Sequence, residues 1–145
     1  MTLNIQRLTS TAVLPSRGTD QSAGLDLRAD LTSPVTLPPG GSHLFSTGLA
    51  IALPEGTVGL VFGRSGLGIR HGLVPSNAVG VIDADYRGEV MVGLRNLSQT
   101  PYTVEPGERI AQLVVLPALF PDIAEAPSLG QTARGTGGFG STGRE

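Results

Sequence analysis

The chain of 145 residues contains no cysteine, so disulfide bonds and metal sites with thiolate ligands are excluded. No apolar run approaches the roughly 18 residues that a membrane-spanning helix needs. The first residues, MTLNIQRLTS, lack the charged and apolar regions of a signal peptide. We therefore expect a cytoplasmic protein that does not enter the membrane, although the lack of cysteine alone does not report the compartment.

The chain also contains no lysine, and all ten of its basic residues are arginine. A net charge of −2 argues against a protein that binds nucleic acid, because such proteins normally carry a basic footprint. The exclusive use of arginine has two explanations. One is a codon bias of the genome, and the other is that guanidinium groups suit phosphate. The count does not choose between them.

Helical periodicity is almost absent from the sequence. Short runs of alternating apolar residues take its place, and turn signals such as PPGG at 38–41 and EPGE at 105–108 separate them. Two runs in which three apolar residues share a face are 57–63 (Val58, Leu60, Phe62) and 88–96 (Val90, Val92, Leu94). This pattern predicts an all-β domain, a sandwich, barrel or jelly roll, with at most a turn or two of helix after Ser65.

The last strand-like run, RIAQLVVLP (109–117), is apolar on both faces except at Gln112. A strand covered on both faces lies deep in a sheet or against another subunit. A buried amide without a partner costs about 1–3 kcal/mol, so we expect Gln112 to bind either the backbone or a ligand. An irregular linker follows, and we divide the chain into a β domain with its linker at 1–133 and a flexible glycine-rich arm at 134–145.

Two segments in the first half carry groups that suit phosphate chemistry. AGLDLRA (23–29) places Asp26 between two leucines, so its carboxylate lies on the opposite face, where a solvated aspartate is the simpler interpretation. GRSGLG (63–68) follows a strand and gathers backbone N–H groups, a hydroxyl and a guanidinium, a combination that suits phosphate oxygens. It lacks the lysine and the spacing of a Walker loop.

A third segment, NAVGVIDADYRGEVM (77–91), predicts a hairpin with Asp83, Asp85 and Tyr86 near its bend. Aspartate is common at such bends for turn chemistry alone. Asp83, however, directly follows the apolar pair Val81–Ile82, so we expect it to be partly buried at the mouth of the hairpin. Burial raises the basicity of a carboxylate, which suits a group that takes a proton from water.

Together these segments resemble the five motifs of the trimeric dUTP pyrophosphatases (dUTPases). The motifs are AGLDLRA, RSGLG, GVIDADYRGEV, PGERIAQL and RGTGGFGSTG, and they extend from Ala23 to Gly143. The resemblance implies a jelly-roll homotrimer whose active sites lie at subunit interfaces. It also implies hydrolysis of dUTP to dUMP and pyrophosphate with Mg²⁺ bound across the triphosphate. The expected partners are dUTP and two further copies of the chain, with no nucleic acid and no membrane.

The resemblance also assigns roles to residues of this sequence. Asp83 would orient and deprotonate the attacking water, Asp26 would hold Mg²⁺ through bound water, and Tyr86 would lie beneath the deoxyribose. The phosphates would contact Arg64, Ser65, Gly66 and Gln112, and the uracil edge would contact Asn77, Val81, Ile82 and Met91. In the arm, Phe139 would stack on the uracil, and the outer phosphates would contact Arg134, Ser141 and Thr142.

Three alternatives remain at the level of the sequence. The first is dCTP deaminase, which shares the fold but uses a glutamate as its base, and the alignment puts Gly93 at that position. The second is a trimeric β domain that binds nucleotide without catalysis. The third, a purely structural jelly-roll subunit, leaves DADYRG and RGTGGFG without a role.

Overall fold

The computed structural model describes residues 2–138, and in this range nearly all regular structure is β-sheet. Phe139, Ser141 and Thr142 of the predicted site lie outside the described residues. The elements in chain order are β1 (Asn4–Arg7), β2 (Leu25–Arg28), β3 (Val35–Leu37), β4 (Ser42–Ala52), β5 (Thr57–Phe62), α1 (Ser65–His71), β6 (Leu73–Pro75), β7 (Gly80–Ile82), β8 (Glu89–Asn96), β9 (Tyr102–Val104) and β10 (Arg109–Pro117).

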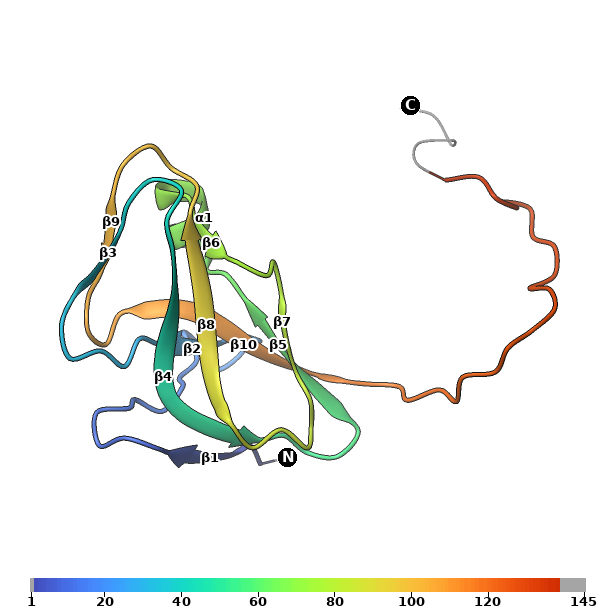
Figure 1. Ribbon diagram of the computed structural model, residues 1–145. Coiled ribbons are helices and arrows are strands. Elements are labelled where there is room, and N and C mark those ends of the chain that lie inside the picture. The colour runs from blue at the N-terminus through green and yellow to red at the C-terminus, as the bar shows by residue number, and fades with distance from the viewer. Residues whose placement is uncertain (1, 139–145) are drawn as a thin grey trace.

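Two four-stranded antiparallel sheets make up most of the fold. One has the strand order β1-β4-β8-β6 and the other β2-β10-β5-β7, while β3 and β9 pair separately. In Figure 1, β4 and β8 run side by side along the domain and β10 crosses their direction. The predicted all-β domain of sandwich or jelly-roll type is confirmed.

The core consists of side chains at alternate positions of these strands, as expected for strands with one face covered. On β8, Val90, Val92 and Leu94 are buried, and Met91 on the opposite face is exposed. Phe45 of β4 is fully buried among them. The alternation in the sequence therefore gave the correct inner face of β8.

Strand β5 turns its smaller residues toward the core. Its buried positions are Thr57, Gly59 and Val61, and its larger side chains form the half-buried face: Val58, Leu60 and Phe62. A β-carbon at Gly59 would lie 3.1 Å from side-chain atoms of Leu53 and Leu113, so the core packs closely there. On the half-buried face, Leu60 lies opposite Val114 of β10, and Val58 lies opposite Leu116. This second face is an apolar surface on the outside of the sheet.

The segment 77–91 is not the paired hairpin that the sequence predicted. β7 pairs with β5, whereas β8 pairs with β4 and β6, so the two strands belong to different sheets. Residues 83–88 cross from one sheet to the other. The periodicity of a strand reports which side chains share a face, but the choice of pairing partner depends on contacts with distant parts of the chain.

Helix α1 spans seven residues, which confirms the predicted turn or two after Ser65. It ends at Gly72, whose φ of 65° lies in the left-handed region and whose N–H bonds back to carbonyls of the last turn. Beyond β10, residues 118–138 extend away from the sheets (Figure 1). Within the described residues, no helix has the length and apolar character needed to span a membrane.

Candidate active site

The first group of predicted site residues gathers where β2, β10 and the start of α1 meet. Asp26 lies on β2, and its two carboxylate oxygens accept hydrogen bonds from Nε of Arg64 and Nη1 of Arg109, both at 3.0 Å. The Asp26 side chain is only 15% exposed. Two guanidinium groups on one carboxylate leave one positive charge in excess, so the group attracts anions. The interpretation of Asp26 as a solvated aspartate is wrong.

Arg64 directly precedes α1 and is held at two points. Besides the bond to Asp26, its Nη1 donates to the backbone oxygen of Arg109 at 3.2 Å. Ser65 and Gly66 follow as the first residues of the helix, and both are exposed. The bonds that fix the guanidinium leave the hydroxyl and the first-turn backbone beside it open to solvent.

Gln112 lies on β10 next to this group, opposite Asp26 in the pairing with β2 and opposite Phe62 in the pairing with β5. Its Nε2 donates to the backbone oxygen of Gly63 at 2.9 Å, so the expected backbone partner is present. An amide nitrogen carries two hydrogens, and the second one is available to a ligand. A β-carbon at Gly24 would lie 2.3 Å from Oε1 of Gln112, so this glycine makes room for the amide.

A second group of predicted residues lines one hollow between β5, β7 and β8. The hollow measures about 140 Å³, and its lining includes all four residues expected to read the base: Asn77, Val81, Ile82 and Met91. Gly80 and Gly93 also line it, so parts of its surface are bare backbone. Ala78, beside Asn77, has a φ of 62°, and its neighbours close a tight turn through the 2.7 Å bond from Val79 N to Asn77 O.

Asp83 and Tyr86 lie in the crossing segment just beyond this hollow. Asp83 is exposed, so the expected partial burial is wrong for the single chain. It lines a separate hollow with Thr57, Val58 and the start of the tail at Ala118 and Phe120. The reason is geometric, because the segment crosses between the sheet edges where this chain supplies no covering layer.

Tyr86 is 43% exposed, and its hydroxyl donates to the backbone oxygen of Glu89 at 3.0 Å. The backbone of the same turn is closed by Tyr86 N, which bonds to Asp83 O at 3.1 Å. Arg87 adds two further bonds to the turn, from Nη1 to the oxygens of Ala84 and Tyr86. The turn therefore has its own hydrogen bonds, independent of the ring.

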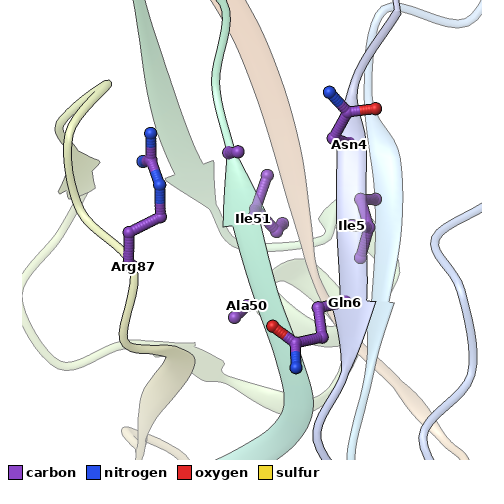
Figure 2. Close-up of a pocket in the computed structure, with 7 residues that line it drawn as sticks. Asn4, Ile5, Gln6, Ala50, Ile51 and Arg87 are labelled. Atoms are coloured by element: carbon purple, nitrogen blue, oxygen red, sulfur yellow. The ribbon is translucent and has the colours of Figure 1, made fainter.

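Another hollow lies on the side of β1 and β4, and Figure 2 shows Asn4, Ile5 and Gln6 on one strand with Ala50 and Ile51 on the next. Arg87 contributes to its lining from the crossing segment. The hollow measures about 230 Å³, and none of the predicted site residues lines it. It therefore stands apart from the candidate site.

The described residues thus form two groups that no side-chain hydrogen bond or ion pair connects. Within 2–138, no hydrogen bond or ion pair joins the group of Asp26, Arg64 and Gln112 to the segment with Asp83 and Tyr86. Arg134 is exposed on the tail, where its backbone oxygen accepts a bond from Gly137. Within one chain, the structure therefore brings together the residues expected to contact the phosphates. It also brings together, at a separate place, the residues expected to contact the uracil.

A sequence model of the dUTPase family matches residues 10–143, nearly the whole chain. The chain belongs to the dUTPase family. It is 48% identical over 140 residues to the deoxyuridine 5'-triphosphate nucleotidohydrolase of Alcanivorax borkumensis, covering 96% of this chain and 93% of that protein. It is 51% identical over 132 residues to the Burkholderia mallei protein of the same name, covering 90% and 89%.

Solved dUTPase structures have the same fold. The dUTPase of Staphylococcus bacteriophage 80alpha, solved with dUPNHPP, matches with a TM-score of 0.89 and 30% identity over 98% of both chains. A mutant dUTPase from phage phi11 of S. aureus matches with a TM-score of 0.80 and 26% identity over 89% of this chain and 99% of that one. Its structure describes the coordination of a structural Mg(II) ion.

The residues of this dUTPase family member can hold Mg²⁺ through water bound to Asp26. Within residues 2–138, no group of three histidine or acidic side chains is placed to hold a metal. Mg²⁺ keeps several waters and needs a carboxylate or two plus phosphate oxygens. Each oxygen of Asp26 accepts one N–H, and a carboxylate has about four acceptor positions, so it can still receive hydrogen bonds from metal-bound water.

The sequence did not single out Arg109, Gly24 or Gly88, which shape the site of this dUTPase. Arg109 sits in PGERIAQL three positions before Gln112, and a bulge in β10 between Arg109 and Ala111 changes the direction of its side chain. Arg109 could have been found from the sequence, because it is a basic residue inside a motif expected to contact phosphate. No such signal marked the two glycines in the sequence, because what they contribute is space for a neighbouring side chain.

Proposed function

We propose that the chain hydrolyses dUTP to dUMP and pyrophosphate at sites that three chains form together. The observation that carries this proposal is the hollow of about 140 Å³ whose lining contains all four residues expected to read uracil. A site that hydrogen-bonds a base edge rejects the wrong base strongly, because buried polar groups would be left without partners. The membership in the dUTPase family supports the same substrate.

The residues that bind the phosphates are already in position before the substrate arrives. Arg64 is held by Asp26 and by the backbone of Arg109 before any ligand arrives, so its remaining N–H groups need no reorganisation to bind phosphate oxygens. Ser65, Gly66 and Gln112 lie beside it and complete the cradle. The donors thus stand where negative charge spreads as the bond to the leaving pyrophosphate breaks.

Asp83 performs the proton transfer. Its carboxylate orients a water molecule toward the α-phosphorus and takes a proton as the water oxygen attacks. The bond between the α-phosphorus and the bridging oxygen breaks, and pyrophosphate leaves with the electron pair. A general base of this kind contributes about 10²–10⁴-fold to the rate.

Asp26 would hold Mg²⁺ through bound water, and the ion would supply charge neutralisation along the triphosphate. The residues of the chain then fix the position of the nucleotide. Tyr86 lies beneath the deoxyribose, and Asn77 with main-chain groups around Val81 and Ile82 reads uracil. Main-chain groups around Met91 contact the uracil edge from β8, and the hollow leaves no room for the methyl group of thymine.

A homotrimer explains why the two groups of residues do not touch in one chain. The apolar outer face of β5 and β10, with Leu60 opposite Val114, offers a surface for a neighbouring copy. A neighbour placed there would cover Asp83 and bring another chain's phosphate residues toward it. The active site would then belong to the interface.

The arm at 134–145 completes the site from a third chain. Residues 118–138 extend away from their own sheets, which supports a reach to a neighbouring subunit (Figure 1). Arg134, Ser141 and Thr142 would hold the outer phosphates, and Phe139 would stack on the uracil, a contact worth about 1–3 kcal/mol. By removing dUTP the enzyme would limit uracil in DNA and supply dUMP for thymidylate, in the cytoplasm.

The test is pyrophosphate release from dUTP, dCTP and dTTP in the presence of magnesium, with ammonia release measured on dCTP. We expect turnover of dUTP alone and no ammonia, since Gly93 gives the hollow no carboxylate for deamination. Asp83→Asn serves as the control and should bind dUTP without turnover. Ammonia from dCTP would favour the deaminase, and binding of dUTP without any hydrolysis would favour a module that only binds nucleotide.

A further inference from the structure

Gly88 lies directly against the ring of Tyr86. A β-carbon at position 88 would be 2.4 Å from the hydroxyl oxygen of Tyr86, 2.6 Å from Cζ and 3.0 Å from Cε2. Non-bonded atoms prefer separations of about 3.5–4.0 Å, so the ring occupies the volume that any other side chain at 88 would need. The ring and a residue larger than glycine cannot both keep these positions.

The backbone itself does not require glycine at this position. Gly88 is not among the described glycines with a positive φ, so a left-handed backbone is not what calls for glycine there. What the position requires is space, and the space is filled by a side chain that the proposed function places against the sugar. The glycine therefore acts on the nucleotide through Tyr86.

We propose that Gly88 is a positioning residue that sets the choice between deoxyribose and ribose by holding the Tyr86 ring flat against the backbone. With the ring on Gly88, its hydroxyl reaches the backbone oxygen of Glu89 at 3.0 Å. In this position the ring fills the space that a ribose 2′-hydroxyl would need, and a ring moved aside from Gly88 would leave that space open. This inference rests on the proposed function, which places Tyr86 beneath the sugar.

A methyl group at 88 would displace the ring without unfolding the turn. The atoms in conflict are at the far end of a side chain that is 43% exposed, so the ring can move away. The turn keeps the bond from Tyr86 N to Asp83 O and the bonds from Arg87 to Ala84 O and Tyr86 O, none of which involves the ring. Asp83 therefore keeps its backbone support in the variant.

The experiment measures kcat/KM for dUTP and for UTP in four proteins: the unchanged chain, Gly88→Ala, Tyr86→Phe and Gly18→Ala. At Gly18 a β-carbon would meet only Oγ of Ser22 at 3.6 Å, an ordinary contact, so this variant controls for the loss of a glycine. We expect Gly88→Ala to lower the ratio of dUTP to UTP efficiency about 10–200-fold, the range for one steric contact. Gly18→Ala should leave the ratio unchanged.

Tyr86→Phe separates the ring from its hydrogen bond. The phenyl ring still fits over Gly88, so this variant should retain most of the discrimination between dUTP and UTP. Its ratio of dUTP to UTP efficiency should fall less than that of Gly88→Ala. Thermal melting of each variant shows that it is folded. The proposal is overturned if Gly88→Ala is folded and keeps the ratio of the unchanged chain, or if it loses activity equally on both nucleotides.

Failure of the underlying function gives a different result. If the unchanged chain hydrolyses neither nucleotide, the proposed function itself is wrong and the inference with it. If the unchanged chain hydrolyses dUTP and UTP equally well, hydrolysis of dUTP is supported, but Tyr86 and Gly88 do not select the sugar.

Discussion

Tyr102 and Glu108 fix the turn that leads into β10, and they do so through one carboxylate. The Tyr102 hydroxyl donates to Oε1 of Glu108 at 2.5 Å, and the backbone N–H of Glu105 donates to Oε2 at 2.9 Å. Burial raises the pKa of Tyr102 from 10.0 to about 12, and the hydrogen bond to Glu108 adds to this effect. The turn then places Arg109 beside Asp26.

Replacement of this tyrosine by phenylalanine tests the contact. We expect Tyr102→Phe to lower the free energy of unfolding by about 1–3 kcal/mol at pH 8, because a carboxylate loses its hydroxyl partner. Between pH 10 and pH 12 the folded tyrosine keeps its proton while the unfolded one loses it. The contribution of Tyr102 to the free energy of unfolding is therefore fully present below pH 10, and it falls as the pH rises toward 12.

Urea denaturation at pH 8, 10 and 11 measures both effects. The unchanged chain should lose more stability over this interval than Tyr102→Phe, which has no group at this position to titrate. Parallel pH profiles for the two proteins would contradict the assignment of the contact.

The residues that carry chemistry could be predicted from the sequence more readily than those that make room for them. Gln112 stands out because a polar group in an apolar strand needs a partner, and Asp26 stands out through the resemblance of AGLDLRA to a dUTPase motif. Gly24 and Gly88 do not stand out, because only a folded chain shows that a neighbouring side chain fills their space. The exposure of Asp83 was also beyond prediction, since in the proposed trimer the cover over it would come from another copy.

At the scale of elements, the predictable part of the fold was the alternation within each strand. The inner face of β8 followed directly from its apolar residues. In β5 the larger apolar residues, such as Leu60, lie on the outer face, and the core takes Gly59 and Val61. A strand with apolar residues on one face does not say whether that face meets its own core or a partner. The crossing of 83–88 was missed for the related reason that pairing is set by distant contacts.

The tail is the element whose removal is most informative. We expect a chain that ends after residue 133 to keep its melting temperature, because the elements of both sheets lie within residues 4–117. Its kcat for dUTP should fall about a hundredfold or more, since the groups that position the phosphates and the base are gone.

A chain shortened only by residues 144–145 is the matched control and should remain active. Full activity of the chain that ends after residue 133 would mean that the arm takes no part in the reaction. A large fall in its melting temperature would mean that the tail supports the fold instead.

At the scale of the whole molecule, the separation of the two residue groups predicts complementation between inactive chains. Arg64→Ala removes a residue of the proposed phosphate cradle, and Asp83→Asn removes the carboxylate proposed to activate water. If each site takes these groups from different chains, mixed trimers contain some sites with both groups intact. For random assembly of equal amounts, about a quarter of the sites are intact.

The measurement is dUTP hydrolysis after the two variants are unfolded together and refolded, beside each variant treated alone. We expect recovery of about a quarter of the activity of the unchanged chain. A mixture no more active than the separate variants would place both groups in the same chain. Light scattering gives the mass, and a value other than three chains would contradict the trimer.

The hollow with Asn77 and Met91 takes its lining from both layers of the sandwich, since Val81 and Ile82 belong to the sheet of β7 and Val92 to the sheet of β8. Its width is therefore a measure of the interlayer spacing. Any substitution deep in the interior that spreads or tightens the layers also resizes this hollow, the proposed site of the pyrimidine. Under the proposed function, interior packing and nucleobase selectivity are therefore subject to the same constraint.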